Sequence, residues 1–434
     1  MIFEQFEVKG LSHFSYAVGC EGTKEIIIID PKRDFDTYTD FAKKNGYKIA
    51  YVTETHIHAD FASGAKELAE ATGAQLLLSA YDEGELFDVS FPHKELKEGD
   101  VISTGGISLK VLHTPGHTPE HISFLLYEAA RSEKDPVMMF TGDFLFIGSV
   151  GRPDLLGEEA KVELAKKLFH SVSGKLKNLP DGMFIYPGHG AGSLCGAGMS
   201  SASTSTLGME RLSNPYLNQK YTEEAFVEKI LSNSPPFPEY YKRMKKINSE
   251  GPKTLNGVPK AEKMSGEDFK KAIAEEKPNL IDLRHPLNYG GGHICSSINI
   301  SNDNLMSSWA PWTISYDKPI YLISDTEDNI EANVRKLIQV GLDDIRGSIT
   351  EFEEWIKPGN SFMSTPQVSV KQLHIQLEED KNALVVDVRS DNEWNGGHIA
   401  NAKHVFLGKL PEEGEELAEK DRKIYVICGG GYRS

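Results

Sequence analysis

Long apolar runs are missing from this 434-residue sequence. No stretch approaches the ~18 residues that a membrane-spanning helix needs, and the N-terminal MIFEQFEVKG lacks the basic-then-apolar layout of a secretory signal. Basic residues are in the minority, because 47 Lys and Arg stand against 64 Asp and Glu, a formal net charge of −17. Phosphate-backbone binding needs clustered basic residues. We therefore expect a cytoplasmic protein that binds neither membranes nor nucleic acids.

Cysteine is also scarce. The four cysteines (Cys20, Cys195, Cys295 and Cys428) are widely scattered and form no CxxC motif, so a disulfide framework is not expected. Single reactive thiols in a reducing cytosol fit this pattern better. The hydrophobic content of 39% and charged content of 26% exclude global disorder. The length suggests two to four domains, each with its own core.

The C-terminal part of the chain contains an internal repeat. Short segments recur about 105 residues apart: Asp-Leu-Arg at 282–284 and Asp-Val-Arg at 387–389, Gly-Gly-His-Ile at 291–294 and 396–399, and IYLIS at 320–324 and IYVIC at 424–428. Each copy alternates apolar strands with helical stretches, which is typical of a parallel sheet. The spacing predicts two tandem α/β domains.

These patterns set the expected domain boundaries. Residues 1–230 read as a mixed α/β domain, and the repeats occupy residues 263–360 and 365–434. Residues 231–262 contain five prolines among Ser, Asn, Gly and Lys, and we interpret them as a Pro-rich linker or an ordered extended arm.

In the first domain, four loops that follow apolar strands carry histidine or aspartate. They are His-Ile-His-Ala-Asp at 56–60, Pro-Gly-His-Thr at 115–118, Thr-Gly-Asp at 141–143 and Tyr-Pro-Gly-His at 186–189. An exposed polar loop would be the default interpretation of the first motif alone. Four such loops together predict a metal-binding cleft, because backbone at strand ends is free to aim side chains at one point.

This set of motifs resembles the metallo-β-lactamase superfamily, whose pattern is HxHxDH, PGHT, Gly-Asp and a final His. The resemblance covers about residues 1–230 and implies an αββα sandwich with the metal at one edge. Phe61 departs from the pattern. In two-zinc members a His at this position joins the preceding Asp and the final His in a second metal site, so we expect a single metal here.

The resemblance implies His56, His117 and Asp143 as the metal ligands. Two histidines and one carboxylate leave open positions that suit one non-haem Fe(II) binding O₂ and a substrate sulfur. The remaining members of the motifs would line the pocket as hydrogen bonders or proton relays: His58, Asp60 and His189.

The run Gly-Arg-Pro-Asp at 151–154 is similar to persulfide dioxygenases of this fold. Arg152 would then bind a carboxylate or sulfur oxyanion, or form a salt bridge with Asp154. Cys195 lies in the glycine-rich residues 188–198. We expect it to carry a persulfide sulfur at the mouth of the metal cleft, although a small buried apolar residue is an equal alternative.

The last seven residues, Cys-Gly-Gly-Gly-Tyr-Arg-Ser at 428–434, resemble the rhodanese active-site loop. The resemblance implies a catalytic Cys428, stabilised as thiolate or persulfide by Arg433 and by the backbone N–H groups of Gly429, Gly430 and Gly431. Rhodaneses continue into a helix after this loop, so we expect the domain of residues 365–434 to be incomplete at its C-terminus. The first copy has Ser324 at the cysteine position and acidic neighbours, which predicts an inactive domain.

Together these resemblances imply a persulfide dioxygenase–rhodanese fusion, similar to bacterial multidomain sulfurtransferases of sulfide detoxification. The implied substrates are low-molecular-weight or protein persulfides with O₂, and the implied products are sulfite and thiosulfate. One Fe(II) per chain and a homo-oligomer are expected. Two alternatives stay open: a zinc-dependent hydrolase like glyoxalase II, and a sulfur relay whose metal domain is vestigial.

Overall fold

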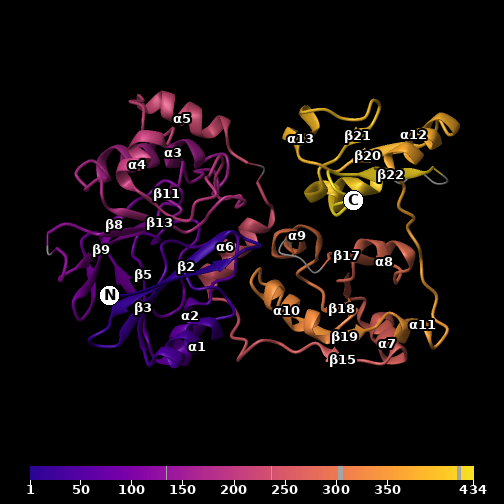
Figure 1. Ribbon diagram of the computed structural model, residues 1–434, viewed down its shortest axis with the longest axis horizontal. Helices are drawn as coiled ribbons and strands as arrows, with labels where there is room; N and C mark the ends of the chain where they lie inside the picture. Colours follow the sequence, from indigo (N-terminus) through magenta and orange to yellow (C-terminus); the bar gives the residue numbers. More distant parts are fainter. Residues whose placement is uncertain (133, 236, 302–305, 418–421) are drawn as a thin grey trace. The chain divides into compact units, whose positions relative to one another are not determined.

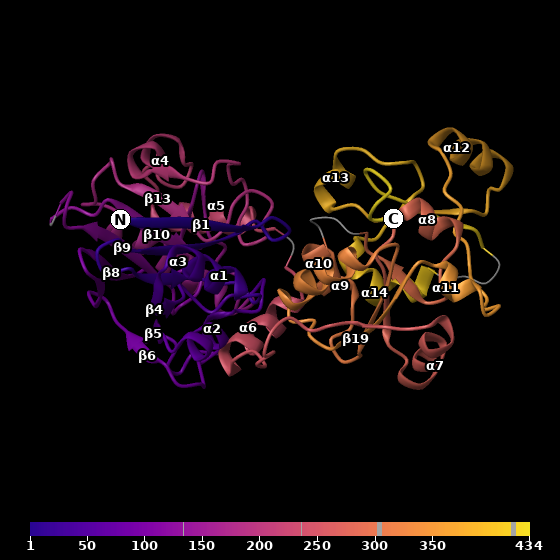
Figure 2. The same cartoon turned by 60° about the horizontal axis from the view of Figure 1, so that its bottom comes forward.

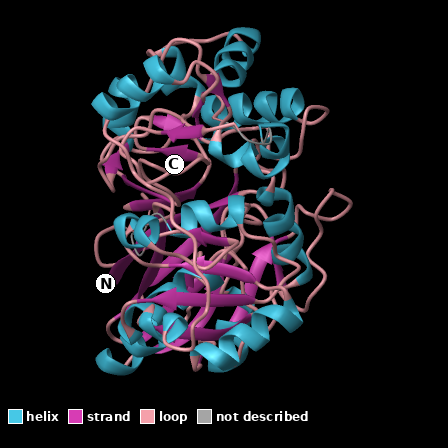
Figure 3. Ribbon diagram, turned by 90° about the vertical axis from the view of Figure 1, so that its right-hand side faces the viewer, coloured by secondary structure: helices cyan, strands magenta, loops and turns pink. Residues whose placement is uncertain are grey.

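The computed structural model describes residues 1–434 apart from 133, 236, 302–305 and 418–421 (Figure 1). The chain divides into two compact units. Met1–Pro259 and Arg335–Asp343 form the first, and Lys260–Val334 and Asp344–Ser434 form the second. Both units contain helices and strands (Figure 3). Within the described ranges, no helix is long and apolar enough to cross a membrane.

The first unit contains two large mixed sheets. One has the order β1 (Ile2–Val8), β2 (His13–Cys20), β3 (Glu25–Ile29), β4 (Lys48–Thr53), β5 (Gln75–Ser79), β6 (Lys94–Leu96). The other has the order β14 (Ser205–Thr206), β13 (Phe184–Pro187), β10 (Met138–Gly142), β9 (Ile122–Glu128), β8 (Ile107–His113), β7 (Val101–Thr104), and a small ribbon pairs β11 (Leu145–Phe146) with β12 (Ser149–Val150).

Three apolar clusters pack the two sheets against each other and against helices. The central cluster joins the inner faces of both sheets, for example Ile27 of β3 with Phe124 of β9. A second cluster packs the first sheet against α1 (Asp36–Asn45) and α2 (Ala65–Thr72), and a third packs the other sheet against α3 (Lys161–His170) and α5 (Glu223–Ser232) (Figure 1). α4 (Leu207–Ser213) also contributes Leu207 to the third cluster. The expected αββα sandwich is confirmed.

The segment interpreted as a linker is only partly extended. α5 ends at Ser232, inside the expected linker, and α6 (Tyr240–Glu250) is a helix whose inner side is buried in the first unit. Tyr241, Met244 and Lys245 are almost fully buried there. Because proline is tolerated outside helices but not in their interior, the prolines of this segment flank α6 and do not prevent it. The linker prediction is corrected accordingly.

The second unit contains two parallel sheets. The order of the first is β15 (Glu262–Lys263), β19 (Ile345–Thr350), β18 (Ile320–Ser324), β16 (Asn279–Asp282), β17 (Ser297–Asn299); the second has β21 (Lys403–His404), β20 (Leu384–Asp387), β22 (Ile424–Ile427). The helices are α7 (Gly266–Glu276), α8 (Pro286–Gly291), α9 (Met306–Thr313), α11 (Glu353–Ile356), α12 (Val370–Glu379), α13 (Asp391–Asn395) and α14 (Leu410–Glu413) (Figure 2). α10 (Glu327–Ile338) begins in this unit, and its residues from Arg335 onward belong to the first.

The two copies of the sequence repeat form matching side-chain contacts. Arg284 forms a bidentate ion pair with Asp282 and donates to the Gly292 carbonyl oxygen at 2.7 Å. In the second copy Arg389 pairs with Asp387 and donates to Gly397 at 2.8 Å. The prediction of tandem parallel-sheet domains is confirmed.

Candidate metal centre

Three side chains from separate strand-end loops converge in the first unit. His56 follows β4, His117 follows β8, and Asp143 follows β10. Their donor atoms lie within 4.8 Å of one another, and all three residues are buried. Oδ2 of Asp143 lies 3.4 Å from Nε2 of His117 and 3.9 Å from Nε2 of His56. The structure therefore brings together the three ligands predicted from the sequence.

Hydrogen bonds fix which nitrogen of His56 is free. The Thr55 hydroxyl donates its one hydrogen to Oδ2 of Asp30 at 3.0 Å, so it accepts a hydrogen bond from Nδ1 of His56 at 2.9 Å. Nε2 of His56 is then the unprotonated nitrogen and faces the cluster. Burial lowers the pKa of His56 well below its usual value, which keeps the ring neutral.

His117 is held in the same way. Its Nδ1 donates to the carbonyl oxygen of Arg152 at 2.9 Å, and burial lowers its pKa well below the usual value. Nε2 of His56, Nε2 of His117 and Oδ2 of Asp143 are buried and form no hydrogen bond. Buried polar atoms without partners are costly unless something binds them, so this face fits a metal ion.

The backbone around Asp143 is fixed by two further contacts. Nε2 of His121 accepts the N–H of Asp143 at 3.0 Å. Gly142 has φ +49°, and a Cβ there would lie 2.5 Å from Oγ1 of Thr55 and 2.6 Å from Nε2 of His121. Only glycine fits this close approach. His121 was left out of the predicted site and acts as a structural hydrogen bonder.

The other histidine of the HxHxD motif turns away from the cluster. Nε2 of His58 lies 3.2 Å from Oδ1 of Asp30 in a hydrogen bond. Although burial alone would lower it, Asp30 raises the pKa of His58 above its usual value. Asp30, which the sequence analysis did not single out, thus contacts both His58 and Thr55. His58 lies beside the metal ligands and is hydrogen-bonded to Asp30.

The helix inside the expected linker holds the ligand loop in place. Lys245 of α6 donates to the Ile57 carbonyl oxygen at 2.9 Å, and Asn248 donates to the carbonyl oxygens of His58 and Phe61 at 2.8 Å each. Glu120 accepts the Ile57 N–H at 3.0 Å and lies 3.6 Å from Nζ of Lys245. Sequence reasoning missed these residues, because their contacts join segments that are 63 to 190 residues apart.

The Arg152 side chain is hydrogen-bonded to other groups of the same chain. Its Nε and Nη2 donate to the two carboxylate oxygens of Asp154 at 2.6 and 2.8 Å, and its guanidinium also reaches the carbonyl oxygens of Leu194 and Pro235. Only 1% of its side chain is exposed. Of the two predicted roles, the geometry matches the salt bridge with Asp154.

A second cluster adjoins the first. Asp60, His189 and Cys195 are buried, and their donor atoms lie within 4.8 Å of one another. Cys195 is 1% exposed, so it does not lie on an open loop at the mouth of the cleft as expected. Burial, together with Asp60 and Asp143, raises the pKa of this thiol well above its usual value.

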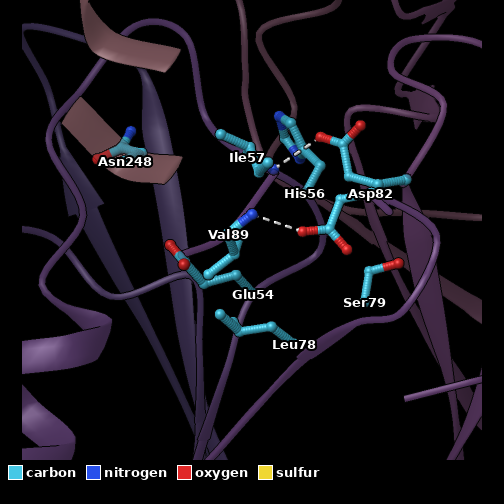
Figure 4. A pocket seen from close by; sticks show the side chains of 9 residues that line it. Glu54, His56, Ile57, Leu78, Ser79, Asp82, Val89 and Asn248 are labelled. Atoms are coloured by element: carbon cyan, nitrogen blue, oxygen red, sulfur yellow. Dashed lines mark hydrogen bonds between the residues drawn. The ribbon is translucent and has the colours of Figure 1, made fainter. Parts of the chain in front are cut away.

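A small pocket borders His56 on the side of β5 (Figure 4). Its lining includes the carboxylates of Glu54, Asp82 and Glu120. Asp82 accepts the Val89 N–H at 2.7 Å. Burial raises the pKa of Glu54 to about 7, so this pocket places a group that titrates near neutrality beside the ligand loop.

In the second unit, the loop after β22 surrounds the Cys428 sulfur. The Gly431 N–H donates to Sγ at 3.0 Å, and Ser434 Oγ lies 3.7 Å from it. Burial would raise the pKa of Cys428, but backbone N–H groups of the loop outweigh this and lower it. Arg433 forms a bidentate ion pair with Glu393 at 2.8 and 2.6 Å. Glu393, which the sequence analysis did not single out, thus neutralises the charge of Arg433.

The first repeat lacks this arrangement. Ser324 ends β18, is buried, and accepts the Thr326 N–H at 3.3 Å. Asp325 follows it and accepts a hydrogen bond from Asn288. A serine next to a carboxylate does not supply a thiolate, so the geometry agrees with an inactive domain.

Comparison with known proteins places this geometry in a family. Residues 8–189 match the metallo-beta-lactamase superfamily, and residues 265–357 and 369–434 match the rhodanese-like domain. The mouse protein "Persulfide dioxygenase ETHE1, mitochondrial" is 32% identical over 220 residues, which cover 50% of this chain and 76% of the relative. This chain belongs to the persulfide dioxygenase family. It carries rhodanese-like domains fused to that core.

Two further proteins are similar to this chain. A crystal structure of a metallo-beta-lactamase from Staphylococcus aureus subsp. aureus COL is 37% identical, with a TM-score of 0.73, and covers 81% of this chain and 99% of that one. The likeness therefore extends beyond residues 8–189. A hydroxyacylglutathione hydrolase from Polaromonas sp. is 33% identical over 41% of this chain and 62% of its own length.

Proposed function

We propose that this protein is an Fe(II)-dependent persulfide dioxygenase coupled to a rhodanese sulfurtransferase. The observation that carries the proposal is the buried face of His56, His117 and Asp143, whose inward donor atoms have no hydrogen-bond partner. Two neutral imidazoles and one carboxylate are a ligand set that suits non-haem iron with open coordination positions. The 32% identical proteins named persulfide dioxygenases support the same reaction and substrate class.

The iron would supply binding and activation of O₂ next to the substrate's terminal sulfur. The overall reaction takes one thiol persulfide, one O₂ and one water to a thiol, sulfite and two protons. The chain's own residues keep the site ready for this chemistry. Asp30 and Thr55 orient His56, and the Arg152 carbonyl oxygen orients His117. The contacts of α6 hold the ligand loop in its buried position.

The second half of the proposed reaction belongs to Cys428. Its thiolate would take the sulfane sulfur of a second persulfide and release the thiol. Sulfite would then accept that sulfur as thiosulfate and regenerate the thiolate. The lowered pKa of Cys428 supports this role, because the thiolate is the nucleophile. Low-molecular-weight or protein persulfides are the proposed sulfur donors.

The coupling is tested by measuring sulfite and thiosulfate together. Wild type and Cys428→Ser, both loaded with Fe(II), receive glutathione persulfide in air-saturated buffer. We expect Cys428→Ser to consume O₂ at the wild-type rate but to release sulfite in place of thiosulfate. Cys295→Ser is the matched control, because Cys295 is exposed and lies outside the loop. An unchanged product ratio in Cys428→Ser contradicts the coupling.

The second candidate is a zinc-dependent thioester hydrolase, which the 33% identity to a hydroxyacylglutathione hydrolase favours. Phe61 stands where the two-zinc pattern has a ligand, which favours the dioxygenase. The zinc-loaded protein with a glutathione thioester decides between them. We expect no hydrolysis above the metal-free background, whereas zinc-dependent turnover would favour the hydrolase.

A further inference from the structure

A short segment of the first rhodanese-like domain belongs to the metal-binding unit. Residues 265–357 match the rhodanese-like domain, yet Arg335–Asp343 from within that match form one compact unit with Met1–Pro259. The segment comprises the end of α10 and the turn that leads to β19. Its Val340 and Leu342 are buried. The dioxygenase and sulfurtransferase steps described above assign no role to this segment.

The centre of this segment contacts the end of the ligand loop, residues 56–61. The backbone carbonyl oxygen of Gln339 accepts the N–H of Ala62 at 2.7 Å. Ala62 directly follows Phe61 and is fully buried. A buried backbone N–H needs a partner within the protein, because leaving it unpaired away from water costs free energy. Gln339 therefore supplies a hydrogen bond that keeps the end of the ligand loop in its buried position.

The Gln339 side chain joins the segment to the residues that follow β3. Its Nε2 donates to Oδ1 of Asp34 at 2.9 Å, and both residues are buried. Nζ of Lys32 donates to Oδ2 of Asp34 at 3.0 Å, and Lys32 also pairs with Ser63, the residue after Ala62, in an isolated β-bridge. Through its backbone and its side chain, Gln339 thus links the end of the ligand loop to the residues after β3.

The rest of the segment is anchored beside Gln339. Nη2 of Arg33 donates to Oδ2 of Asp343 at 3.0 Å, and only 1% of the Arg33 side chain is exposed. Gly341 has φ +72°, and a Cβ on it would lie 3.1 Å from Cε of Met244 in α6. The segment therefore packs against α6, the helix that supports the ligand loop.

We propose that the first rhodanese-like domain, which has Ser324 at the cysteine position, helps to position the metal centre through Gln339. Gln339 acts through the backbone of the ligand loop, so it is a positioning residue and not a metal ligand. The inference rests on the metal-binding role proposed for His56, but it holds whichever reaction the metal supports. It gives the catalytically inactive domain a function in the other half of the protein.

Hydrogen exchange and metal affinity test the proposal in the full-length protein. Gln339→Leu removes the amide that donates to Asp34. In the metal-free protein we expect faster amide exchange in peptides covering residues 57–64 and unchanged exchange in β9. Cobalt(II), followed by competition with a chelator, should bind about 3–10-fold more weakly. This is less than the 10–100-fold typical of a ligand's own hydrogen-bond partner, because Gln339 acts through the loop backbone. Gln367→Leu is the matched control, since Gln367 is exposed and belongs to the second unit.

Gly341→Val displaces the same segment without changing Gln339. The added side chain meets Met244, whereas Gly359→Val carries a similar positive φ of +80° and meets nothing within 4 Å. We expect Gly341→Val to reproduce the changes in exchange and affinity seen in Gln339→Leu. Gly359→Val should leave both at the values of the parent protein.

Unchanged exchange of residues 57–64 in Gln339→Leu and Gly341→Val overturns the proposal, and so does an unchanged cobalt(II) affinity. Exchange that rises equally in β9 also overturns it, because that result shows a general loss of stability and no specific effect on the ligand loop. A parent protein that binds no cobalt(II) contradicts the proposed function, whereas the exchange of the metal-free variants still decides whether Gln339 holds the loop.

Discussion

Nδ1 of His189 donates to Oδ1 of Asp143 at 2.7 Å, while Oδ2 of the same carboxylate lies 3.4 Å from Nε2 of His117. Asp143 therefore belongs to the first metal-binding cluster through one oxygen and contacts the second through the other. Its Oδ1 accepts from His189 and its backbone N–H donates to His121, whereas Oδ2 forms no hydrogen bond and faces the first cluster. This convergence makes the position of Asp143 sensitive to the hydrogen bonds around it.

The hydroxyl of Thr55 is expected to control metal affinity. Thr55→Val keeps the side-chain shape but breaks the link between Asp30 and Nδ1 of His56. Loss of such a supporting contact typically lowers metal affinity about 10–100-fold. Competition with a chelator measures the metal affinity of each variant. Thr118→Val is the matched control, because the buried Thr118 hydroxyl has no hydrogen-bond partner. Equal affinities for Thr55→Val and wild type would disprove this role.

Gly142→Ala should destabilise the first unit. Its Cβ would lie 2.5 Å from Oγ1 of Thr55, in addition to the cost of a positive φ. Gly157→Ala shares the positive φ but meets nothing within 4 Å, so it isolates the clash. We expect Gly142→Ala to lose about 1–3 kcal/mol more than the control in urea denaturation followed by circular dichroism. Similar losses in the two variants would mean that the loop relaxes freely.

Asp154→Asn tests the structural role of Arg152. The variant leaves a buried guanidinium without its charged partner, and we expect a loss of about 3 kcal/mol in unfolding free energy. The KM for persulfide should stay unchanged, because Arg152 is bound to protein groups. Asp181→Asn breaks an exposed pair with Arg211 and should cost less than about 1 kcal/mol. A raised KM without loss of stability would instead assign Arg152 to the substrate.

Cys428 should react as a thiolate at unusually low pH. Its pKa is lowered in the folded protein, so the alkylation rate rises with pH and reaches its plateau below the pH that an ordinary thiol requires. Glu393→Gln removes the anion that neutralises Arg433, so the added positive charge should shift the midpoint to still lower pH. Iodoacetamide kinetics in a Cys20→Ser, Cys295→Ser background measure the pH midpoint of Cys428 alkylation.

Glu412→Gln serves as the control for that shift, because Glu412 is an exposed acid of the same domain. It should leave the midpoint in place. A midpoint that moves upward in Glu393→Gln would show that the ion pair acts by positioning Arg433 and not by neutralising it.

Much of the metal centre was predictable because its residues belong to strand-end loops with local signatures. The motifs at 56–60, 115–118 and 141–143 predict a metal cleft, and the family resemblance that they carry implies His56, His117 and Asp143 as its ligands. The motif does not distinguish His56 from His58, however. Only Asp30, which lies at the end of β3, shows that His58 turns away.

Other parts depend on contacts that no local pattern encodes. The prolines between 231 and 262 predicted a linker, whereas burial of Tyr241, Met244 and Lys245 makes part of it a helix that supports the ligand loop. Glycines around Cys195 suggested an open loop, but that loop packs inward and buries the thiol. The fold classes were predictable because strand-and-helix alternation and the repeat of about 105 residues are properties of the sequence itself.

Oxygen uptake with glutathione persulfide tests the central claim most directly. The full-length protein is loaded with Fe(II) or with Zn²⁺ and compared with Asp143→Ala in an oxygen electrode. We predict uptake of one O₂ per two persulfides by the Fe(II) form only, because thiosulfate formation at Cys428 consumes a second persulfide, and loss of that uptake in Asp143→Ala. Absence of uptake by the Fe(II) form, with thioester hydrolysis by the Zn²⁺ form, would contradict the account.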